Sequence, residues 1–196
     1  MKNNSPVSLV LFASGNGSNV LNIINYFKSI PEINVSAVFC NNKDAKVIAK
    51  SKKEGIEVFV FNKKELAEKD TVLDKLRYYS TDFIVLAGFL LKIPDKIINT
   101  YPNRILNIHP ALLPKYGGKG MYGMHVHRAV VENCEPESGI SIHYVNEHYD
   151  EGAIIFQAKC QVLKTDTAED VAAKIHDLEM QHFPEVIHGV LQKTRS

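Results

Sequence analysis

Three short runs of apolar residues constrain the fold of this chain more than any other feature of its sequence. Residues 7–12 (VSLVLF), 35–40 (VSAVFC) and 83–87 (FIVLA) are almost continuously apolar. A strand with this pattern has both faces buried, which is typical of a parallel sheet covered by helices. Helical periodicity separates the runs, and parallel strands joined through helices connect by right-handed crossovers. We therefore expect an α/β fold with a mostly parallel, Rossmann-like open sheet and helices on both faces.

The other expected elements continue this pattern and change it near the C-terminus. Residues 139–145 alternate well enough for a strand with one buried and one more solvent-exposed face, which favours an antiparallel strand paired with a last strand at 153–162. Further strands are expected at 57–61 and 105–108, and helices at 20–27, 45–54, 66–79, 125–133 and from 166 to near Pro184. Because 196 residues with 45% hydrophobic content suffice for one packed core, we expect a single domain over 1–196.

A glycine-containing loop, Ser14-Gly15-Asn16-Gly17-Ser18-Asn19, follows the first strand and opens the first helix. Unpaired N–H groups at a helix N-terminus, together with such a loop, favour an anion site. Alternatively, Gly15 and Gly17 only let the chain turn sharply. Val20 stands where the third glycine of a dinucleotide-binding fingerprint belongs, and no G-K-[ST] sequence marks a Walker loop. The interpretation that remains is a site for a single phosphate.

A carboxamide and an imidazole are expected side by side at the end of the strand at 105–108. Side chains alternate along a strand, so Asn107 and His109 point the same way, and Pro110 ends the run. With an acid such as Asp150, from the turn at 146–152, they would form an acyl-transfer set of amide donor, acid–base group and orienting carboxylate. Each residue also has a purely structural interpretation: His109 as a core histidine, Asn107 as a hydrogen-bonding residue at the strand end, and Asp150 as an ordinary turn residue.

Composition and charge exclude several classes of protein. Lys+Arg 23 against Asp+Glu 22 gives a net charge of +1, so we expect no nucleic-acid partner. The separated Cys40, Cys134 and Cys160 fit neither a disulfide framework nor a zinc site, and no histidine pattern matches a metal motif, so we expect no metal. The segment 1–6 has no apolar core and no stretch reaches 18 apolar residues, so we expect no membrane partner and a cytoplasmic location.

The motifs, taken together, resemble the phosphoribosylglycinamide formyltransferase family, folate-dependent enzymes of purine synthesis. The matching segments are SGNGSN at 14–19, LAGF at 86–89, NIHPALLPKY at 107–116, HVHRAV at 125–130, GISIHYVNEHYDEG at 139–152 and the region from Glu179 to Pro184. NIHP-x-LLP with a later D-x-G is characteristic of the wider formyltransferase group. Its combination with the glycine loop is characteristic of this family, and the segments occur in order over nearly the whole chain.

This resemblance implies a reaction and a set of site residues. The formyl group of 10-formyltetrahydrofolate, a co-substrate, would pass to the amine of 5-phosphoribosylglycinamide without a metal, in a monomer or homodimer. Asn107, His109 and Asp150 would be catalytic. The implied ribonucleotide ligands are Gly17, Ser18, Asn19 and Glu179, and the implied folate-binding residues are Leu90, Leu91, Lys92, Ile93, Asn107, Asn146 and Tyr149. The N-terminal half would bind the phosphate, and the C-terminal half would hold the folate pocket and the catalytic turn.

Two alternatives stay open from the sequence. One is another enzyme of the formyltransferase group, either a formyltetrahydrofolate hydrolase or an enzyme that makes formyl-methionyl-tRNA; the latter would need a basic surface. The other is a non-catalytic module that binds folate or a phosphoribosyl group. Two segments depart from the family pattern: Leu90-Leu91 precede Lys92 where Met-Arg is common, and the glycine-rich loop at 117–124 is longer than in many members.

Overall fold

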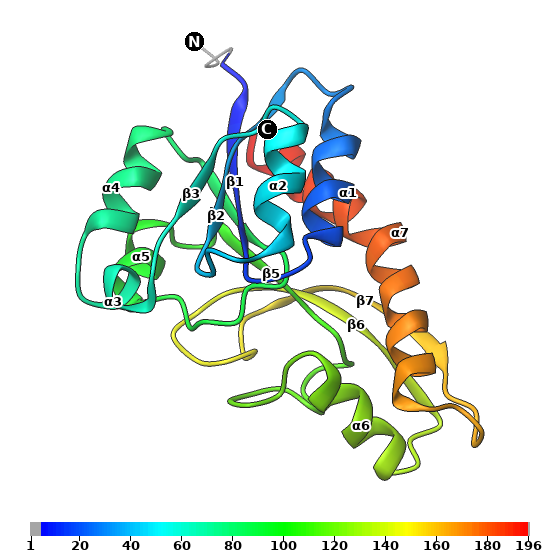
Figure 1. The fold of residues 1–196 in the computed structure, drawn as a ribbon. Helices are drawn as coiled ribbons and strands as arrows, with labels where there is room; N and C mark the ends of the chain where they lie inside the picture. Colours follow the sequence, from blue (N-terminus) through cyan, green and yellow to red (C-terminus); the bar gives the residue numbers. More distant parts are fainter. Residues whose placement is uncertain (1–4, 196) are drawn as a thin grey trace. The chain divides into compact units, whose positions relative to one another are not determined.

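The computed structural model describes residues 5–195 and confirms the expected fold class. Its strands, of which all except β4 are labelled in Figure 1, are β1 Val7–Ala13, β2 Ile33–Cys40, β3 Val58–Val60, β4 Phe83–Leu86, β5 Ile105–His109, β6 Glu137–Tyr144 and β7 Ile154–Gln161. The helices are α1 Ser18–Phe27, α2 Lys46–Lys53, α3 Lys63–Ala67, α4 Thr71–Tyr78, α5 Asp95–Thr100, α6 Met124–Glu132 and α7 Ala168–Arg195. The strand order is β3-β2-β1-β4-β5-β6-β7.

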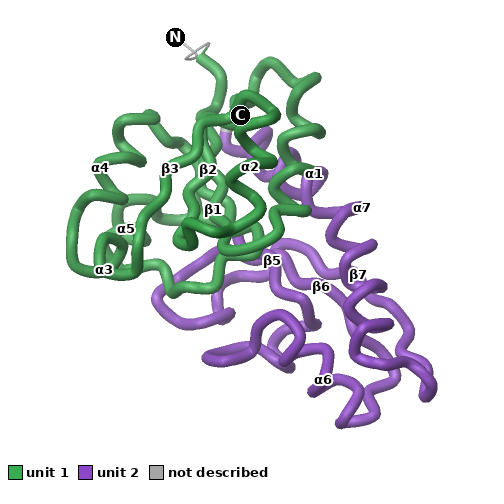
Figure 2. Tube along the Cα trace, viewed as in Figure 1, with its two compact units in different colours: residues 1–105 green, residues 106–196 purple. Residues whose placement is uncertain are grey.

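The chain forms two compact units, residues 1–105 and 106–196, which Figure 2 colours separately. In the first unit β1 pairs in parallel with β2 and β4, and β2 pairs in parallel with β3. Helices α1 and α2 lie on one side of these strands, and α4 and α5 lie on the other (Figure 1). This arrangement buries both faces of β1, which explains why its sequence is almost continuously apolar.

Aromatic rings fill the core of the first unit. Phe12 of β1 packs against Phe39 of β2, with ring centroids 5.1 Å apart, and against Phe89 at the same distance. Phe61, directly after β3, completes the cluster at 6.0 Å from Phe12. Each buried ring of this size contributes about 2–3 kcal/mol of hydrophobic free energy, so the cluster fixes the end of β1 from which the glycine loop departs.

In the second unit β5, β6 and β7 form antiparallel pairs, as expected for the C-terminal strands. Helix α7 packs against α6, β6 and β7. The register of β5 and β6 places Asn107 opposite His143 and His109 opposite Ser141. Residues opposite one another in an antiparallel pair have Cβ atoms about 5 Å apart, so this register brings four polar side chains together.

The structure corrects three expectations about helices. Helix α7 does not end near Pro184 but continues through it to Arg195. Proline removes one backbone hydrogen bond, at a cost of about 3 kcal/mol, but Phe183, Ile187, Val190 and Leu191 are buried on one face of the helix and outweigh that loss.

The second correction concerns the single helix expected at 66–79. The structure divides it into α3, which begins at a capping box between Asn62 and Glu65, and α4, for which Asp70 is the N-cap residue. The third is α5, a helix of six residues that was not expected. The Pro94-Asp95 pair at its start is a helix-start signal in the sequence.

Two expectations about the whole chain, the absence of a membrane partner and the single domain, stay predictions. No helix within residues 5–195 is long and apolar enough to cross a membrane. Most of the 1–6 segment lies outside the described residues. The assignment of 1–196 to a single domain stays a prediction.

Candidate functional site

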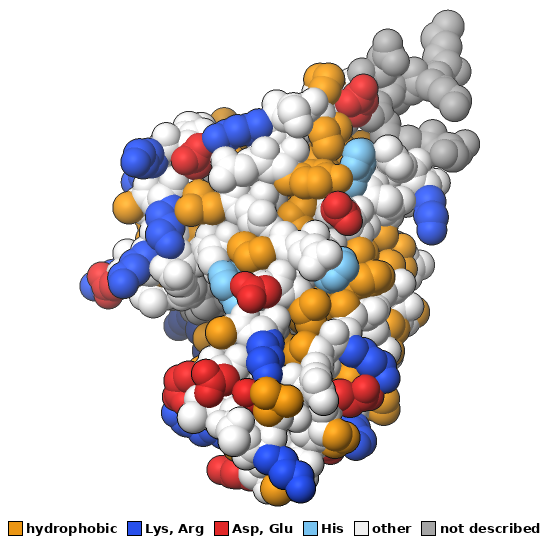
Figure 3. Space-filling view, turned by 90° about the vertical axis from the view of Figure 1, so that its right-hand side faces the viewer, with side chains coloured by type: hydrophobic (Ala, Val, Ile, Leu, Met, Phe, Trp, Pro, Cys, Tyr) orange, Lys and Arg blue, Asp and Glu red, His pale blue; other side chains and the backbone are white. Residues whose placement is uncertain are grey.

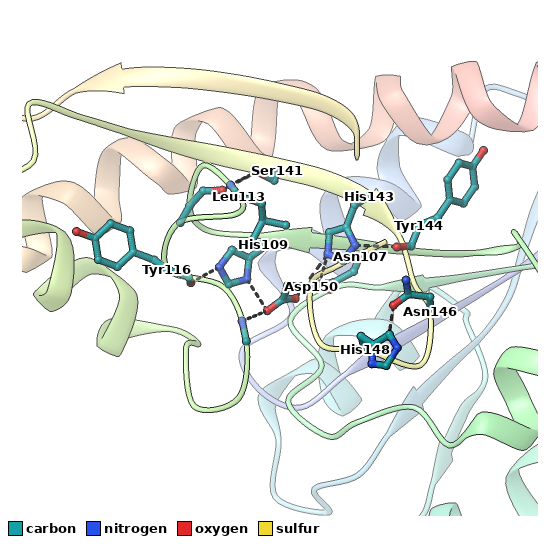
Figure 4. A network of polar contacts seen from close by, with 12 residues as sticks. Asn107, His109, Leu113, Tyr116, Ser141, His143, Tyr144, Asn146, His148 and Asp150 are labelled. Carbon is teal, nitrogen blue, oxygen red and sulfur yellow. Dashed lines mark hydrogen bonds and ion pairs between the residues drawn. The ribbon is translucent and has the colours of Figure 1, made fainter. Parts of the chain in front are cut away.

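The predicted trio of Asn107, His109 and Asp150 comes together within the second unit. Figure 4 shows Asp150 between the rings of His109 and His143, with Asn107 beside His143. Asn107 and His109 come from β5, and Asp150 comes from the turn between β6 and β7. The alternation of β5 therefore aims both side chains to one face, as the sequence predicts, and the turn brings the carboxylate to them.

Both ring nitrogens of His109 have partners. Nε2 lies 2.7 Å from the carbonyl oxygen of Tyr116, and because a carbonyl can only accept, Nε2 carries a proton and donates it. Nδ1 lies 3.6 Å from Oδ2 of Asp150. The ring is 3% exposed, and this burial lowers the pKa of His109 below its usual value, although the charge of Asp150 acts to raise it. The neutral ring thus carries its proton on Nε2, and Nδ1, which faces Asp150, is the nitrogen that can take up a second proton.

Asp150 is held in place by main-chain geometry. Its Oδ2 accepts a hydrogen bond from the Gly118 N–H at 2.9 Å, and its own φ of 57° lies in the left-handed region. Gly117 is needed next to it, because a Cβ there would lie 2.6 Å from Cδ2 of Leu113 and 3.3 Å from Cβ of Asp150. Burial acts to raise the pKa of Asp150, but the His143 and His109 rings and the Gly118 N–H together lower it. The carboxylate is therefore ionised over the physiological pH range.

A hydrogen-bonded group around Ser141 supports the turn after His109. The Ser141 hydroxyl is fully buried and donates to the carbonyl of Ala111 at 2.7 Å. It also accepts from the Leu113 N–H at 2.9 Å and from the Gln157 amide at 2.7 Å. Sequence reasoning missed Ser141, His143 and the carbonyl of Tyr116. The alternation of residues 139–145 places Ser141 and His143 on one face, which was the only available signal for them.

The glycine loop lies in the first unit, where it leads into α1. Gly17 is the N-cap residue, with φ of 77°, and its carbonyl accepts the first helical bond from Leu21 N–H. A Cβ at Gly17 would lie 2.4 Å from Cγ2 of Val47 in α2, so this glycine is required by close packing as well as by its φ. The strand–loop–helix geometry expected of an anion site is present, and binding by Gly17, Ser18 and Asn19 stays a prediction.

The residues predicted to bind folate are divided between the units. In the first unit, Leu90 is 53% exposed, whereas Ile93 is buried in the core. Leu91 and Lys92 lie between them, and Lys92 Nζ is 3.9 Å from Asp95.

In the second unit, the Asn146 side chain accepts from the His148 N–H at 3.0 Å, and the Tyr149 ring is exposed. Glu179, predicted to bind the ribonucleotide, lies on α7 with Oε2 3.8 Å from Nδ1 of His176. The roles of these residues stay predictions, except that the burial of Ile93 leaves its side chain a packing role.

Residues 5–195 contain no set of metal ligands, and the face drawn in Figure 3 carries charges of both signs. No group of three His, Cys, Asp or Glu side chains there could hold a metal ion, and Cys40, Cys134 and Cys160 are free thiols. Among the coloured residues of the face drawn in Figure 3, Lys and Arg side chains are interspersed with Asp and Glu side chains.

Comparisons with known proteins agree on one family. A family model described as formyl transferase matches residues 7–187. The chain is 40% identical to the phosphoribosylglycinamide formyltransferase, chloroplastic, of Arabidopsis thaliana, covering 94% of this chain and 65% of the relative. It is 35% identical to the Escherichia coli (strain K12) phosphoribosylglycinamide formyltransferase, covering 92% of this chain and 85% of the relative. The chain thus spans less than two thirds of the length of the plant relatives, 65% for Arabidopsis thaliana and 61% for Vigna unguiculata.

Solved structures support the same relationship. The crystal structure of phosphoribosylglycinamide formyltransferase from Anaplasma phagocytophilum superimposes with a TM-score of 0.88 at 30% identity, covering 96% of this chain and 89% of that one. The structure of the Brucella melitensis protein of the same name gives a TM-score of 0.83 at 34% identity, covering 98% and 97% of the two chains.

Proposed function

This chain belongs to the formyl transferase family, and from that premise we propose that it transfers a formyl group from 10-formyltetrahydrofolate to the amine of 5-phosphoribosylglycinamide. The observation that carries the proposal is the cluster of Asn107, His109 and Asp150 around one point in the second unit. An amide donor, a buried imidazole and an ionised carboxylate are the groups that acyl transfer requires when no serine or cysteine nucleophile is used.

In this mechanism the attack of the substrate amine turns the formyl oxygen into an oxyanion. Asn107 donates an N–H to that oxygen, and the protonated Nδ1 of His109 is the second donor. His109 is suited to this role because its Nε2–H is committed to the Tyr116 carbonyl, so the ring can turn only Nδ1 toward a substrate. These two donors act on charge that develops in the transition state, so they lower the barrier more than they tighten binding.

Asp150 stabilises the imidazolium form of His109 by its negative charge, 3.6 Å from Nδ1. The same Nδ1–H then protonates the folate nitrogen as the C–N bond to the formyl carbon breaks. The attacking amine loses one proton, and its transfer to Nδ1 restores the imidazolium, so one proton leaves the amine, one arrives on the folate nitrogen and His109 ends in its starting state. Direct transfer of this kind needs no metal ion.

The substrates divide between two kinds of subsite in this proposal. The N-terminal end of α1 binds the ribonucleotide phosphate through the N–H groups of Gly17, Ser18 and Asn19, helped by the positive end of the helix dipole. Glu179, in the second unit, is a further proposed ligand of the ribonucleotide. The proposed folate ligands are Leu90, Leu91, Lys92 and Ile93 in the first unit and Asn107, Asn146 and Tyr149 in the second.

One pair of assays tests the proposal. Purified protein is given 10-formyltetrahydrofolate with and without glycinamide ribonucleotide, and formylated product and free tetrahydrofolate are both measured. We expect transfer only when the ribonucleotide is present, and transfer that is slower by about 100-fold or more in His109→Ala. Folate release without the acceptor would identify a formyltetrahydrofolate hydrolase instead. Tight binding of both ligands without turnover would identify a binding module.

Location and assembly are also part of the proposal. We place the protein in the cytoplasm, as a monomer or homodimer; the plant relatives carry the word chloroplastic in their names. Cell fractionation and analytical ultracentrifugation of the purified chain test these two points.

A further inference from the structure

His143 is a buried titratable group that the proposed reaction does not use. It is 2% exposed and lies on β6, directly opposite Asn107 of β5. Its ring makes contacts on both sides: Nδ1 lies 2.8 Å from the Tyr144 carbonyl oxygen, and Nε2 lies 3.1 Å from Nδ2 of Asn107. A buried ring with two such partners is held in one orientation.

The Tyr144 contact decides where the proton of the neutral ring is. A carbonyl oxygen has no hydrogen to give, so Nδ1 of His143 must donate, and Nε2 of the neutral ring is then an acceptor with a free lone pair. Nδ2 of Asn107 has two N–H groups and no lone pair to offer. The 3.1 Å contact is therefore an N–H of Asn107 donating to Nε2 of His143.

A competing arrangement would place a second proton on His143. The groups that face the ring are the Asn107 amide, the Tyr144 carbonyl and the Asp150 carboxylate, whose Oδ1 lies 3.6 Å from Nε2. An imidazolium would set two donors against each other at 3.1 Å, while its distance to Asp150 exceeds that of a normal hydrogen bond. Asp150 also has two other partners, the Gly118 N–H and the His109 ring. The geometry thus favours the neutral ring.

From these contacts we infer that His143 is a positioning residue that fixes the direction of the Asn107 carboxamide. One N–H of Asn107 is taken up by Nε2 of His143, which leaves the other N–H to face the reacting oxygen. Without this acceptor the amide can rotate by half a turn and present its oxygen, which would repel an oxyanion. This inference rests on the proposed function for its kinetic part, and its structural part stands without it.

Gly152 provides the space for this arrangement. A Cβ at that position would lie 1.7 Å from the Tyr144 carbonyl oxygen and 3.5 Å from Nδ1 of His143. A side chain there would push away the carbonyl that fixes the His143 tautomer. Gly152, two residues after Asp150, therefore helps to position His143, because it leaves room for the Tyr144 carbonyl.

The first test is the tautomer. Long-range ¹H–¹⁵N spectra of the uniformly ¹⁵N-labelled protein, with the His143 signals assigned by their loss in His143→Gln, are expected to show a ring protonated on Nδ1 and unprotonated on Nε2. A ring protonated on Nε2 at a pH where the protein is active would overturn the inference. This measurement needs no activity, so it still tests the inference if the proposed reaction is wrong.

The second test is kinetic coupling. We expect His143→Leu to lower kcat by about 10- to 100-fold, part of the usual effect of an oxyanion donor, with KM for both substrates changed less than threefold. His143→Gln keeps an acceptor oxygen and should recover most of kcat. In an Asn107→Ala background, His143→Leu should have almost no further effect, because the two residues act as one unit. Losses that multiply in the double variant would contradict the inference.

A remote histidine provides the control for these variants. His188 lies on α7, where its Nε2 is 3.0 Å from the Gln192 amide, far along the chain from the cluster. His188→Leu should leave kcat unchanged. Wild-type protein that transfers no formyl group would reject the proposed function, whereas a wild-type enzyme that is active and indifferent to His143→Leu would reject only the inference about His143.

Discussion

The Nε2–H of His109 donates to the main-chain carbonyl of Tyr116 at 2.7 Å, and this contact fixes the tautomer of the neutral His109 ring. It leaves Nδ1 as the nitrogen that faces Asp150, so in the proposed reaction this single ring atom would both stabilise the oxyanion and deliver the proton. Tyr116 can offer its carbonyl because its backbone is in the left-handed region, with φ of 56°, and because its hydroxyl is tied to Glu135 at 2.9 Å.

Removal of the imidazole tests this assignment. We expect His109→Ala to lower kcat by about two to four orders of magnitude, the usual effect of one positioned acid–base group. Both ligands should still bind, since His109 is not among the residues predicted to bind the phosphate or the folate. Steady-state kinetics and calorimetric titration of each ligand measure the two effects. Turnover within a few-fold of wild type would make His109 a structural residue.

The amide of Asn107 should matter mainly in the transition state. Asn107→Ala removes a donor to the developing oxyanion, and we expect kcat to fall by about 10²- to 10³-fold while dissociation constants change little. Asn107→Asp is a matched variant of the same size, and it should be at least as inactive because a carboxylate cannot donate to an oxyanion. If instead KM rises and kcat is preserved, Asn107 is a binding residue.

The sequence predicts that Gly17 binds phosphate, and the structure gives this glycine a packing role as well. Gly17→Ala places a methyl group against Val47 in a left-handed conformation, so we expect a loss of about 2 kcal/mol or more in the free energy of unfolding. Gly15→Ala is the control, because a Cβ there meets no atom within 4 Å. Urea denaturation measures both variants, and equal stability would show that the loop can relax.

This stability loss makes Gly17 variants a poor test of binding. Amide chemical shifts of Gly17, Ser18 and Asn19 on titration with inorganic phosphate test the anion site without altering the backbone. We expect these three signals to shift together and saturate. Shifts no larger than those elsewhere in the protein would argue against the site.

The sequence predicted the strands and the shared face of Asn107 and His109 because each depends on a local pattern, whereas the catalytic roles of the trio stay predictions. Apolar runs such as 7–12 become buried strands, and alternation alone sets Asn107 and His109 on one face. His143 was missed because its importance comes from the register of β5 against β6, and register depends on residues far apart in the chain.

The predicted end of helix α7 near Pro184 is wrong for a related reason. Pro184 is a local signal for a helix end, but Ile187 and Leu191 continue the buried face beyond it, and tertiary packing outweighed the local signal. The resemblance implies that Ile93 binds folate; the structure buries its side chain in the core, and a role in folate binding stays a prediction.

The electrostatic link between Asp150 and His109 can be measured directly. Burial lowers the pKa of His109 from its usual value, and Asp150 is the largest influence acting to raise it. Asp150→Asn removes that charge and keeps the size of the side chain, so the pKa of His109 should fall further and the imidazolium should be lost at lower pH than in the wild type. NMR titration of the His109 ring in both proteins gives the two pKa values. Because less of the ring is then protonated at neutral pH, kcat should fall as well, and the loss should be smaller when the assay is run at lower pH. An unchanged pKa of His109 together with near-normal kcat would place Asp150 outside the mechanism and leave its carboxylate the single role of holding the Gly118 loop.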